Sequence, residues 1–232
     1  MKYSPSVCPS ALAFAIIAFS LGSAAAAQTP ALEKGVSVQM AATTNATAFP
    51  QADNEDAWIV AVTANGSLYF GVKPVTVGSL TEEMKSTPRR REARLYVKAD
   101  ARARFDAVKQ ALHAAQRVLF ETAVLLTDQP PHTPDVAMVP PQGLEVSLAL
   151  PSRTATVVEL YNSGRPTAGL KVNDQEISWS ALPAALSEAS QGGSVKQVVL
   201  EADGSLPFDQ IVRVIDVSRA LGAKVALSLA GL

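Results

Sequence analysis

Asp100 and Asp203 are the residues whose surroundings in the sequence best suit chemistry. Each follows an apolar run, and four residues then separate each from a Phe-Asp pair that begins at Phe105 or Phe208. The turn between a strand and a helix often holds a catalytic acid. The location equally suits a turn former, because an Asp side chain accepts hydrogen bonds from backbone N–H groups at a helix start. We favour this structural role, with Phe105 and Phe208 as anchors of the helices that follow.

The segments that begin at Asp100 and Asp203 belong to a pattern that occurs twice in the chain. The strands and helices of this pattern hold the two aspartates in place. Each half of the chain reads strand, hairpin, short helix, strand, long helix, strand. From the two aspartates onward the halves align without gaps, which pairs Leu112 with Ile215 and Val124 with Leu227. A repeat of this kind indicates a duplicated domain.

The first half provides the following elements. Alternation, apolar runs and turn residues predict strands at 36–40, 58–62, 68–70, 95–97 and 124–126. Apolar residues spaced along one face predict a helix over 104–119. A shorter helix ends near Ser86, and Ser79 with Glu82 has the spacing of a capping box at its start.

The second half repeats this order. Its strands are predicted at 144–148, 156–161, 170–172, 198–200 and 225–227. Residues 180–183 open the short helix, with Pro183 in its first turn. The long helix covers 207–221, and Gly222 is placed as its C-terminal stop. The first half has Leu119 at the matching position, so the end of its long helix is unusual.

A helix that connects two parallel strands packs on one face of their sheet. We therefore predict an α+β protein of two similar two-layer domains, each a small mixed sheet with two helices packed on one face. The predicted organisation is a signal peptide (1–27), a connector (28–34), a first domain (35–128), a proline-rich linker (129–142) and a second domain (143–232).

Composition limits the classes of function. The chain has 232 residues, is 48% hydrophobic and has a net charge of -1, so it has material for folded cores. The near-neutral charge argues against nucleic acid as the main partner, because phosphate binding needs clustered Lys and Arg. Cys8 is the one cysteine and lies in the leader, so the mature chain can form no internal disulfide.

Residues 1–27 read as a secretory signal. Lys2 is followed by an apolar core over 11–21 and by small residues before Gln28. The alternative is an uncleaved membrane anchor, whose apolar span would be near the lower limit of roughly 17 residues for crossing a bilayer. We favour cleavage, which makes the mature protein periplasmic; the alternative is a single N-terminal anchor in the inner membrane with a periplasmic C-terminus.

Several segments together match a known family. They are the hairpin with Pro74-Val75, the strand before Ala202-Asp203, the helix that starts at Phe208, and the segment 221–227. In order and spacing they resemble the periplasmic domain of the ExbD/TolR biopolymer-transport family. The resemblance covers 36–127 and again 144–229, with the second copy closer, so the chain resembles a tandem duplication of that domain.

The resemblance implies an energy-transducing complex. Members of this family have one N-terminal transmembrane helix, whose Asp takes part in proton-driven motor function with an ExbB- or TolQ-like channel subunit. A carboxylate inside a membrane is costly and marks ion coupling. The present chain has no carboxylate between Lys2 and Glu33. The proton-relay residue of the family therefore carries over to no position of this sequence.

Other candidate chemistry is sparse. His113 lies on a predicted helix and His132 in the linker, without Cys or carboxylate at ligand spacing, so we expect no zinc site. The serines lack a histidine in a triad pattern, and neither Gly-x-Ser-x-Gly nor a phosphate-binding loop occurs. We predict a protein that is not an enzyme and that uses no metal or cofactor.

One dense basic run remains as a contact patch, made of Arg89, Arg90, Arg91 and Arg94. It could meet an acidic partner, membrane headgroups or an anionic cell-wall polymer, but we favour a solvated loop before a strand. Trp58 and Trp179 lie at strand positions and are interpreted as core residues rather than as a ligand platform.

These observations lead to one main hypothesis. The chain is expected to be a periplasmic interaction protein that associates with envelope motor or TonB/Tol-like proteins, with possible self-association through sheet edges. Membrane contact is expected only if the leader stays uncleaved. The alternatives are an anchored ExbD-like transport subunit and a module that binds the cell wall or a small ligand.

Overall fold

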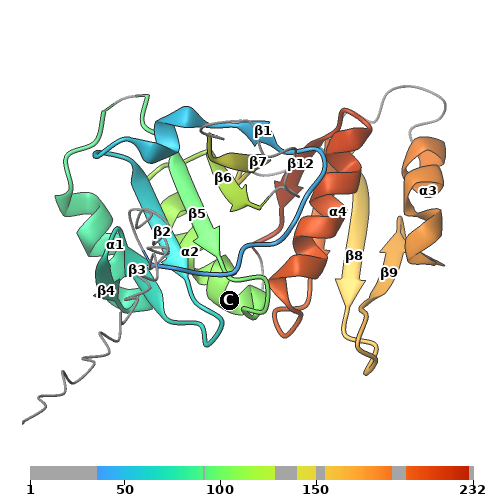
Figure 1. The fold of residues 1–232 in the computed structure, drawn as a ribbon. Helices are drawn as coiled ribbons and strands as arrows, with labels where there is room; N and C mark the ends of the chain where they lie inside the picture. The colour runs from blue at the N-terminus through green and yellow to red at the C-terminus, as the bar shows by residue number, and fades with distance from the viewer. Residues whose placement is uncertain (1–35, 91, 129–139, 150–154, 190–196, 230–232) are drawn as a thin grey trace, which may run out of the picture. The chain divides into compact units, whose positions relative to one another are not determined.

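A computed structural model describes residues 36–90, 92–128, 140–149, 155–189 and 197–229 of the chain (Figure 1). The predicted signal peptide, the connector, Arg91 and most of the proline-rich linker lie outside the described residues. The boundaries of the two domains stay predictions.

From residue 58 onward, the predicted helices and strands appear in the expected order. The helices are α1 (Val77–Ser86), α2 (Phe105–Arg117), α3 (Leu182–Ala189) and α4 (Phe208–Ala220), with short 3-10 turns η1 (Pro50–Asp53) and η2 (Trp179–Ala181). The strands of the first half are β1 (Thr47–Ala48), β2 (Trp58–Val62), β3 (Leu68–Phe70), β4 (Lys73–Val75), β5 (Leu95–Ala99) and β6 (Thr122–Thr127). Those of the second half are β7 (Gln142–Ser147), β8 (Thr156–Tyr161), β9 (Gly169–Val172), β10 (Gln175–Ile177), β11 (Gln197–Ala202) and β12 (Lys224–Leu227).

The described strands form one mixed sheet in the order β10-β9-β8-β11-β12-β7-β6-β5-β2-β3-β4. Within each half the strands that flank the long helix are parallel, and the hairpins are antiparallel. The α+β class is therefore confirmed. Each half contains the predicted mixed sheet, and the two sheets continue into one another.

Strand β7 makes this connection. It pairs with β6 in antiparallel fashion from Thr122 to Thr127 and with β12 in parallel fashion at Val146 and Ser147. Gly143 allows the close approach to β6, because a Cβ there would lie 2.6 Å from Val124 Cγ1 and 2.9 Å from the Leu125 carbonyl oxygen.

The strand predicted at 36–40 is wrong, because these residues form no strand. The edge of β6 that such a strand would need is already paired with β7. Only the end of β6 remains accessible, where Ala42 makes an isolated bridge to Asp128, and β1 pairs instead with β7. The match between 36–40 and 144–148 therefore holds in sequence but not in structure.

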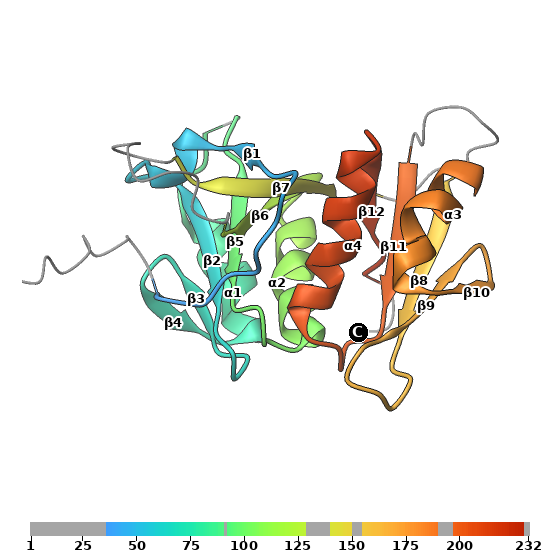
Figure 2. The same ribbon diagram turned by 45° about the vertical axis from the view of Figure 1, so that its right-hand side comes forward.

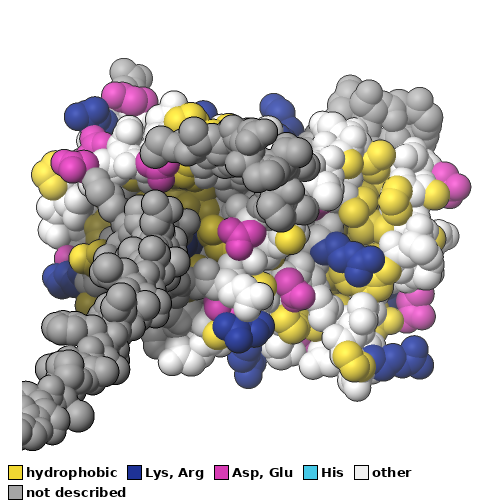
Figure 3. Space-filling model, in the orientation of Figure 1, with side chains coloured by type: hydrophobic (Ala, Val, Ile, Leu, Met, Phe, Trp, Pro, Cys, Tyr) yellow, Lys and Arg dark blue, Asp and Glu magenta, His cyan; other side chains and the backbone are white. Residues whose placement is uncertain are grey.

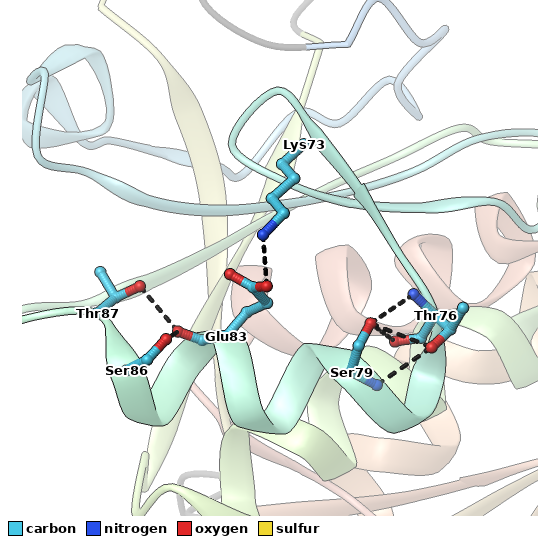
Figure 4. Close-up of polar contacts among 6 residues, drawn as sticks. All are labelled: Lys73, Thr76, Ser79, Glu83, Ser86 and Thr87. Carbon is cyan, nitrogen blue, oxygen red and sulfur yellow. Dashed lines mark hydrogen bonds and ion pairs between the residues drawn. The ribbon is translucent and has the colours of Figure 1, made fainter.

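The cap of the first short helix also differs from the prediction. α1 begins at Val77, and its N-cap is Thr76, whose Oγ1 accepts a hydrogen bond from Ser79 N–H at 3.1 Å (Figure 4). Ser79 Oγ in turn accepts from Thr76 N–H at 2.9 Å, which completes a capping box. Ser79 is thus the third helical residue rather than the cap, and Glu82 has no part in the box.

The long helices bury the faces that their sequences predict. Phe105 and Leu112 of α2 and Phe208 and Ile215 of α4 are fully buried and belong to one apolar core that spans both halves. Figures 1 and 2 show α2 and α4 side by side, with α1 next to α2 and α3 next to α4.

The two long helices end in the same way with different residues. Gly222 follows α4 with φ 77°, as predicted for a C-terminal stop, and Leu119 follows α2 with φ 64°. A left-handed conformation is easy for Gly but costs a side chain such as Leu about 1 kcal/mol.

The gapless alignment fails just beyond these stops. Tyr96 of β5 pairs with Val124, whereas its counterpart Val199 of β11 pairs with Ala226 rather than with Leu227. The second half is therefore one residue shorter between helix and strand. Structurally, Leu125 corresponds to Leu227, and both are buried in the core.

Candidate functional site: the paired turns and the arginine loop

Asp100 closes the turn between β5 and α2. Its side chain is 5% exposed, and its Oδ1 accepts hydrogen bonds from the backbone N–H and Nε of Arg102 at 3.0 and 2.9 Å. Its Oδ2 accepts from Arg102 Nη2 at 3.0 Å and from Gln39 N–H at 3.1 Å. The pKa of Asp100 is lowered from 3.8 to about 2, and the largest cause is the hydrogen bonding from the Arg102 side chain. This carboxylate is ionised at neutral pH and its acceptor sites are occupied, which suits a turn and not an acid catalyst.

Asp203 closes the matching turn between β11 and α4 but is exposed. Its Oδ1 accepts a hydrogen bond from Ser205 N–H at 2.7 Å, and this bond lowers the pKa of Asp203 below its usual value. Both aspartates thus bind the backbone N–H two residues on, as Asx turns do. The geometry supports their interpretation as structural residues, which stays our proposal.

The two turns bind each other. We name the segments 100–106 and 203–209 the turn pair. Four hydrogen bonds of 2.9 Å join them, with the first two helical N–H groups of each long helix as donors: Phe105 N–H to Leu206 O, Asp106 N–H to Gly204 O, Phe208 N–H to Ala103 O and Asp209 N–H to Ala101 O. The N–H groups at a helix start have no partner within their own helix. Here each half supplies those partners for the other.

Gly204 fits closely against the opposite half. A Cβ at this position would lie 1.4 Å from Asp106 Oδ1. Ala101 occupies the corresponding position of the first turn. The turn pair therefore has two-fold hydrogen bonding with unlike side chains, and it includes Phe105 and Phe208, both fully buried.

A third segment ties the halves together. We name residues 39–49 the arm. At one end Ala101 N–H donates to Gln39 O at 2.7 Å, and at the other Phe49 N–H donates to Pro141 O at 2.7 Å. Between them, the backbone N–H of Asn45 donates to Asp216 Oδ1 of α4 at 2.8 Å.

Residues 87–94, which we name the arginine loop, join α1 to β5. Arg89 Nη1 donates to Val118 O at 3.0 Å, and the guanidinium lies 4.4 Å from the centroid of the Phe120 ring. Arg90 pairs with Asp56 at 3.2 Å and Arg94 with Glu145 at 2.7 Å. The structure brings these three arginines to one hollow of about 560 Å³.

Elsewhere on the described surface, basic and acidic side chains are interspersed on the face shown in Figure 3. His113 is half-buried on α2, and His132 lies outside the described residues. Among the residues that the structure describes, no group of three His, Cys, Asp or Glu could hold a metal ion. The arrangement offers interfaces and a basic hollow, and we assign no reaction to it.

The family model for biopolymer transport protein ExbD/TolR matches the chain twice, over residues 12–130 and 122–230. The chain belongs to the ExbD/TolR family. Each match includes one of the two halves, in agreement with a tandem duplication of the domain. No curated protein matches the chain.

Membership of the ExbD/TolR family points to a subunit of an energy-transducing transport complex. The family is an envelope-associated component with a periplasmic domain, and its members act with ExbB/TonB or Tol partners as non-enzymatic accessory proteins. In the described part of this ExbD/TolR chain, no helix is both long and apolar enough to cross a membrane.

The sequence singled out Phe105 and Phe208, whose N–H groups join the halves, but did not indicate three other residues that join them. Gly143, Gly204 and Asp216 belong to the contacts just described. The two glycines stand where a Cβ would clash with another element, and such a clash leaves no local signal in the sequence.

Proposed function

We propose that this protein is a non-enzymatic periplasmic component of an ExbB/ExbD/TonB- or Tol-like complex. In this proposal one chain supplies the pair of periplasmic domains that two subunits would otherwise bring together. The turn pair is the observation that carries it, because each half donates the same backbone hydrogen bonds to the other.

The covalent connection favours such a pair. Two domains in one chain meet at a high effective concentration, so pairing needs no second protein molecule. The shared strand β7 adds main-chain hydrogen bonds to both halves. A partner would therefore meet two preassembled domains rather than a monomer that must first dimerise.

The proposed role excludes proton conduction by this chain. The family's proton-relay Asp has no counterpart between Lys2 and Glu33, where the sequence has no carboxylate. Proton coupling would then belong to another subunit, and this protein would contribute contacts alone.

Capture of partners tests the proposal. The tagged protein is crosslinked mildly in its own cell envelope, and the recovered proteins are identified by mass spectrometry. We expect ExbB-, TolQ-, TonB- or TolA-like proteins, and recovery of none of them would contradict the proposal. Gly204→Ala, which places a methyl group against Asp106, should reduce recovery. Gly78→Ala is the matched control, since its Cβ would meet nothing nearer than Thr76 Oγ1 at 4.0 Å.

The mass of the exported protein separates the two proposed locations. A chain that starts near Gln28 is the cleaved, periplasmic form. A chain that retains the first 27 residues would instead support the anchored ExbD-like subunit, with the same domains held at the inner membrane.

A further inference from the structure

Leu119 combines two unfavourable features. It has a left-handed φ of 64°, where its counterpart in the second half is Gly222, and the residue is 81% exposed. The conformation costs a non-glycine residue about 1 kcal/mol, and exposure forgoes the stabilisation that burial of a Leu would give. A residue that breaks two local rules with no gain in the fold is a candidate for a role in binding.

Leu119 lines a hollow of about 460 Å³ between the ends of α1 and α2. The apolar part of the lining is Trp58, Met84, Pro88, Val118 and Leu119. The charged part is Lys85, Arg89 and Arg117, and this hollow has no carboxylate in its lining. A lining that combines apolar side chains with three cations fits a molecule that has an apolar part and an anionic part.

The second hollow, of about 560 Å³, adjoins the first. Both are lined by Trp58, Pro88 and Arg89. The larger one adds Arg90 and Arg94 to the cations, together with Asp56 and Glu92, and the Asp56 carboxylate is already paired with Arg90. We name the two hollows together the Arg89 groove. Their volumes lie in the usual range for small-molecule sites, roughly 300–1,000 Å³.

Arg89 stands between the two hollows and is held in position. Its guanidinium stacks on Phe120 and donates one hydrogen bond to Val118 O. A guanidinium carries about five N–H donors in a planar fork that suits carboxylate and phosphate, so one bond leaves donors for an anion. The anchoring contacts lower the entropy lost when an anion binds.

We propose that the Arg89 groove binds a monomeric amphipathic anion, a molecule with a carboxylate or phosphate head and a single alkyl chain. Arg89 and Arg117 take the head, and Lys85, which is paired with Glu82 at 2.9 Å, adds positive charge beside it. Val118 and Leu119 take the chain, which also meets the edges of Trp58 and Met84 that are 5% and 2% exposed, and Leu119 forms the exposed rim of the site. This site is independent of the proposed complex and uses residues of the first half only.

Trp58 gives a direct readout. In ¹⁵N spectra of the full chain labelled at tryptophan, the two indole N–H signals are Trp58, which lines the groove, and Trp179, which donates to Ala168 O elsewhere. Trp179→Phe assigns them. We expect dodecyl phosphate, titrated below its micelle concentration, to shift the Trp58 signal in a saturable way and to leave Trp179 unchanged. Inorganic phosphate and the uncharged dodecyl maltoside, at equal concentration, should each shift it far less.

Substitutions of Arg89 and Leu119, with a matched control, test their roles in binding. Arg89→Gln should weaken dodecyl phosphate binding by about tenfold or more, because a charged hydrogen-bond donor is lost. Arg213→Gln is the control, because Arg213 also lies over an aromatic ring, 4.6 Å from the Trp179 centroid. It should leave the affinity unchanged. Leu119→Gly should weaken binding by about fivefold through lost apolar contact, without unfolding the protein.

Several outcomes would overturn the proposal. An unmoved Trp58 signal excludes the site, and equal shifts with inorganic phosphate or dodecyl maltoside exclude an amphipathic ligand. Equal losses in Arg89→Gln and Arg213→Gln exclude a specific cation. Sedimentation with phosphatidylglycerol vesicles in the absence of monomer binding would show a bilayer contact in place of a discrete site.

Discussion

Asp100 and Asp203 occupy equivalent turns but differ in burial and in their hydrogen-bond partners. Asp100 is buried and bound by the Arg102 side chain, whereas Asp203 is exposed and binds Ser205. A hydrogen bond to a charged group contributes more when water is excluded from it. The two aspartates should therefore differ in their contribution to stability although their positions in the repeat are the same.

Asp100→Asn tests this difference. At pH 7 we expect the free energy of unfolding to fall by about 1–2 kcal/mol, and by less in Asp203→Asn. The folded pKa of Asp100, about 2, lies below the value of 3.8 expected when unfolded. Its contribution is therefore fully present above about pH 4 and is lost as the pH falls toward 2. Urea denaturation at pH 7 and pH 3 measures it: the gap between wild type and Asp100→Asn should narrow at pH 3, and a constant gap would contradict this account.

Reciprocal substitutions at Leu119 and Gly222 test the energetic cost of the left-handed conformation. Leu119→Gly should raise the free energy of unfolding by about 0.5–1 kcal/mol, because φ near 64° suits glycine. Gly222→Leu should lower it by at least as much for the same reason. Thermal denaturation of both variants checks the pair. A stabilised Leu119→Gly that binds dodecyl phosphate less tightly would show that Leu119 is kept for the ligand at a cost to the fold.

At the scale of elements, the starts of α2 and α4 depend on each other through the turn pair. Gly204→Ala should destabilise the protein by about 1–3 kcal/mol, because the added methyl group overlaps the Asp106 carboxylate. In the double variant Gly204→Ala/Asp106→Ala the clash is removed, so the effects should be non-additive. A double-mutant cycle by urea denaturation measures the coupling. Additive effects would mean that the two turns do not touch in solution.

The sequence was sufficient for what is encoded within one element. Periodicity predicted the buried faces of α2 and α4, and Gly222 marked a helix end, because these signals are local. It was insufficient where two elements compete for one place. The strand at 36–40 has the right alternation, but β7 already occupies the edge of β6.

In the candidate site, too, the sequence indicated single residues but not the contacts between distant ones. Asp100 and Arg89 were visible as residue types. Their partners are far apart in the sequence, as with Gln39 for Asp100 and Val118 for Arg89. The capping box at Thr76 shows a finer limit, since two overlapping Ser/Thr patterns differ by a few residues and only the backbone conformation decides between them.

At the scale of the whole molecule, the shared sheet should make the two halves unfold together. β7 pairs with strands of both halves, and one apolar core contains residues from α2 and α4. We expect a single transition in differential scanning calorimetry, with equal calorimetric and van't Hoff enthalpies. Two separate transitions would show that the halves are independent domains that merely touch.

The turn pair also bears on how the duplicated chain can change over time. In a dimer of identical subunits, each residue at a two-fold interface occurs twice, so one substitution alters both sides of the contact. Here Gly204 and Ala101 hold corresponding positions, and a Cβ at Gly204 would overlap the Asp106 carboxylate. Because both copies lie in one chain, a substitution on one side of the contact leaves the other side unchanged. The interface can therefore become asymmetric while its backbone pairing is kept, and the two halves can differ at equivalent positions, as they do at Leu119 and Gly222.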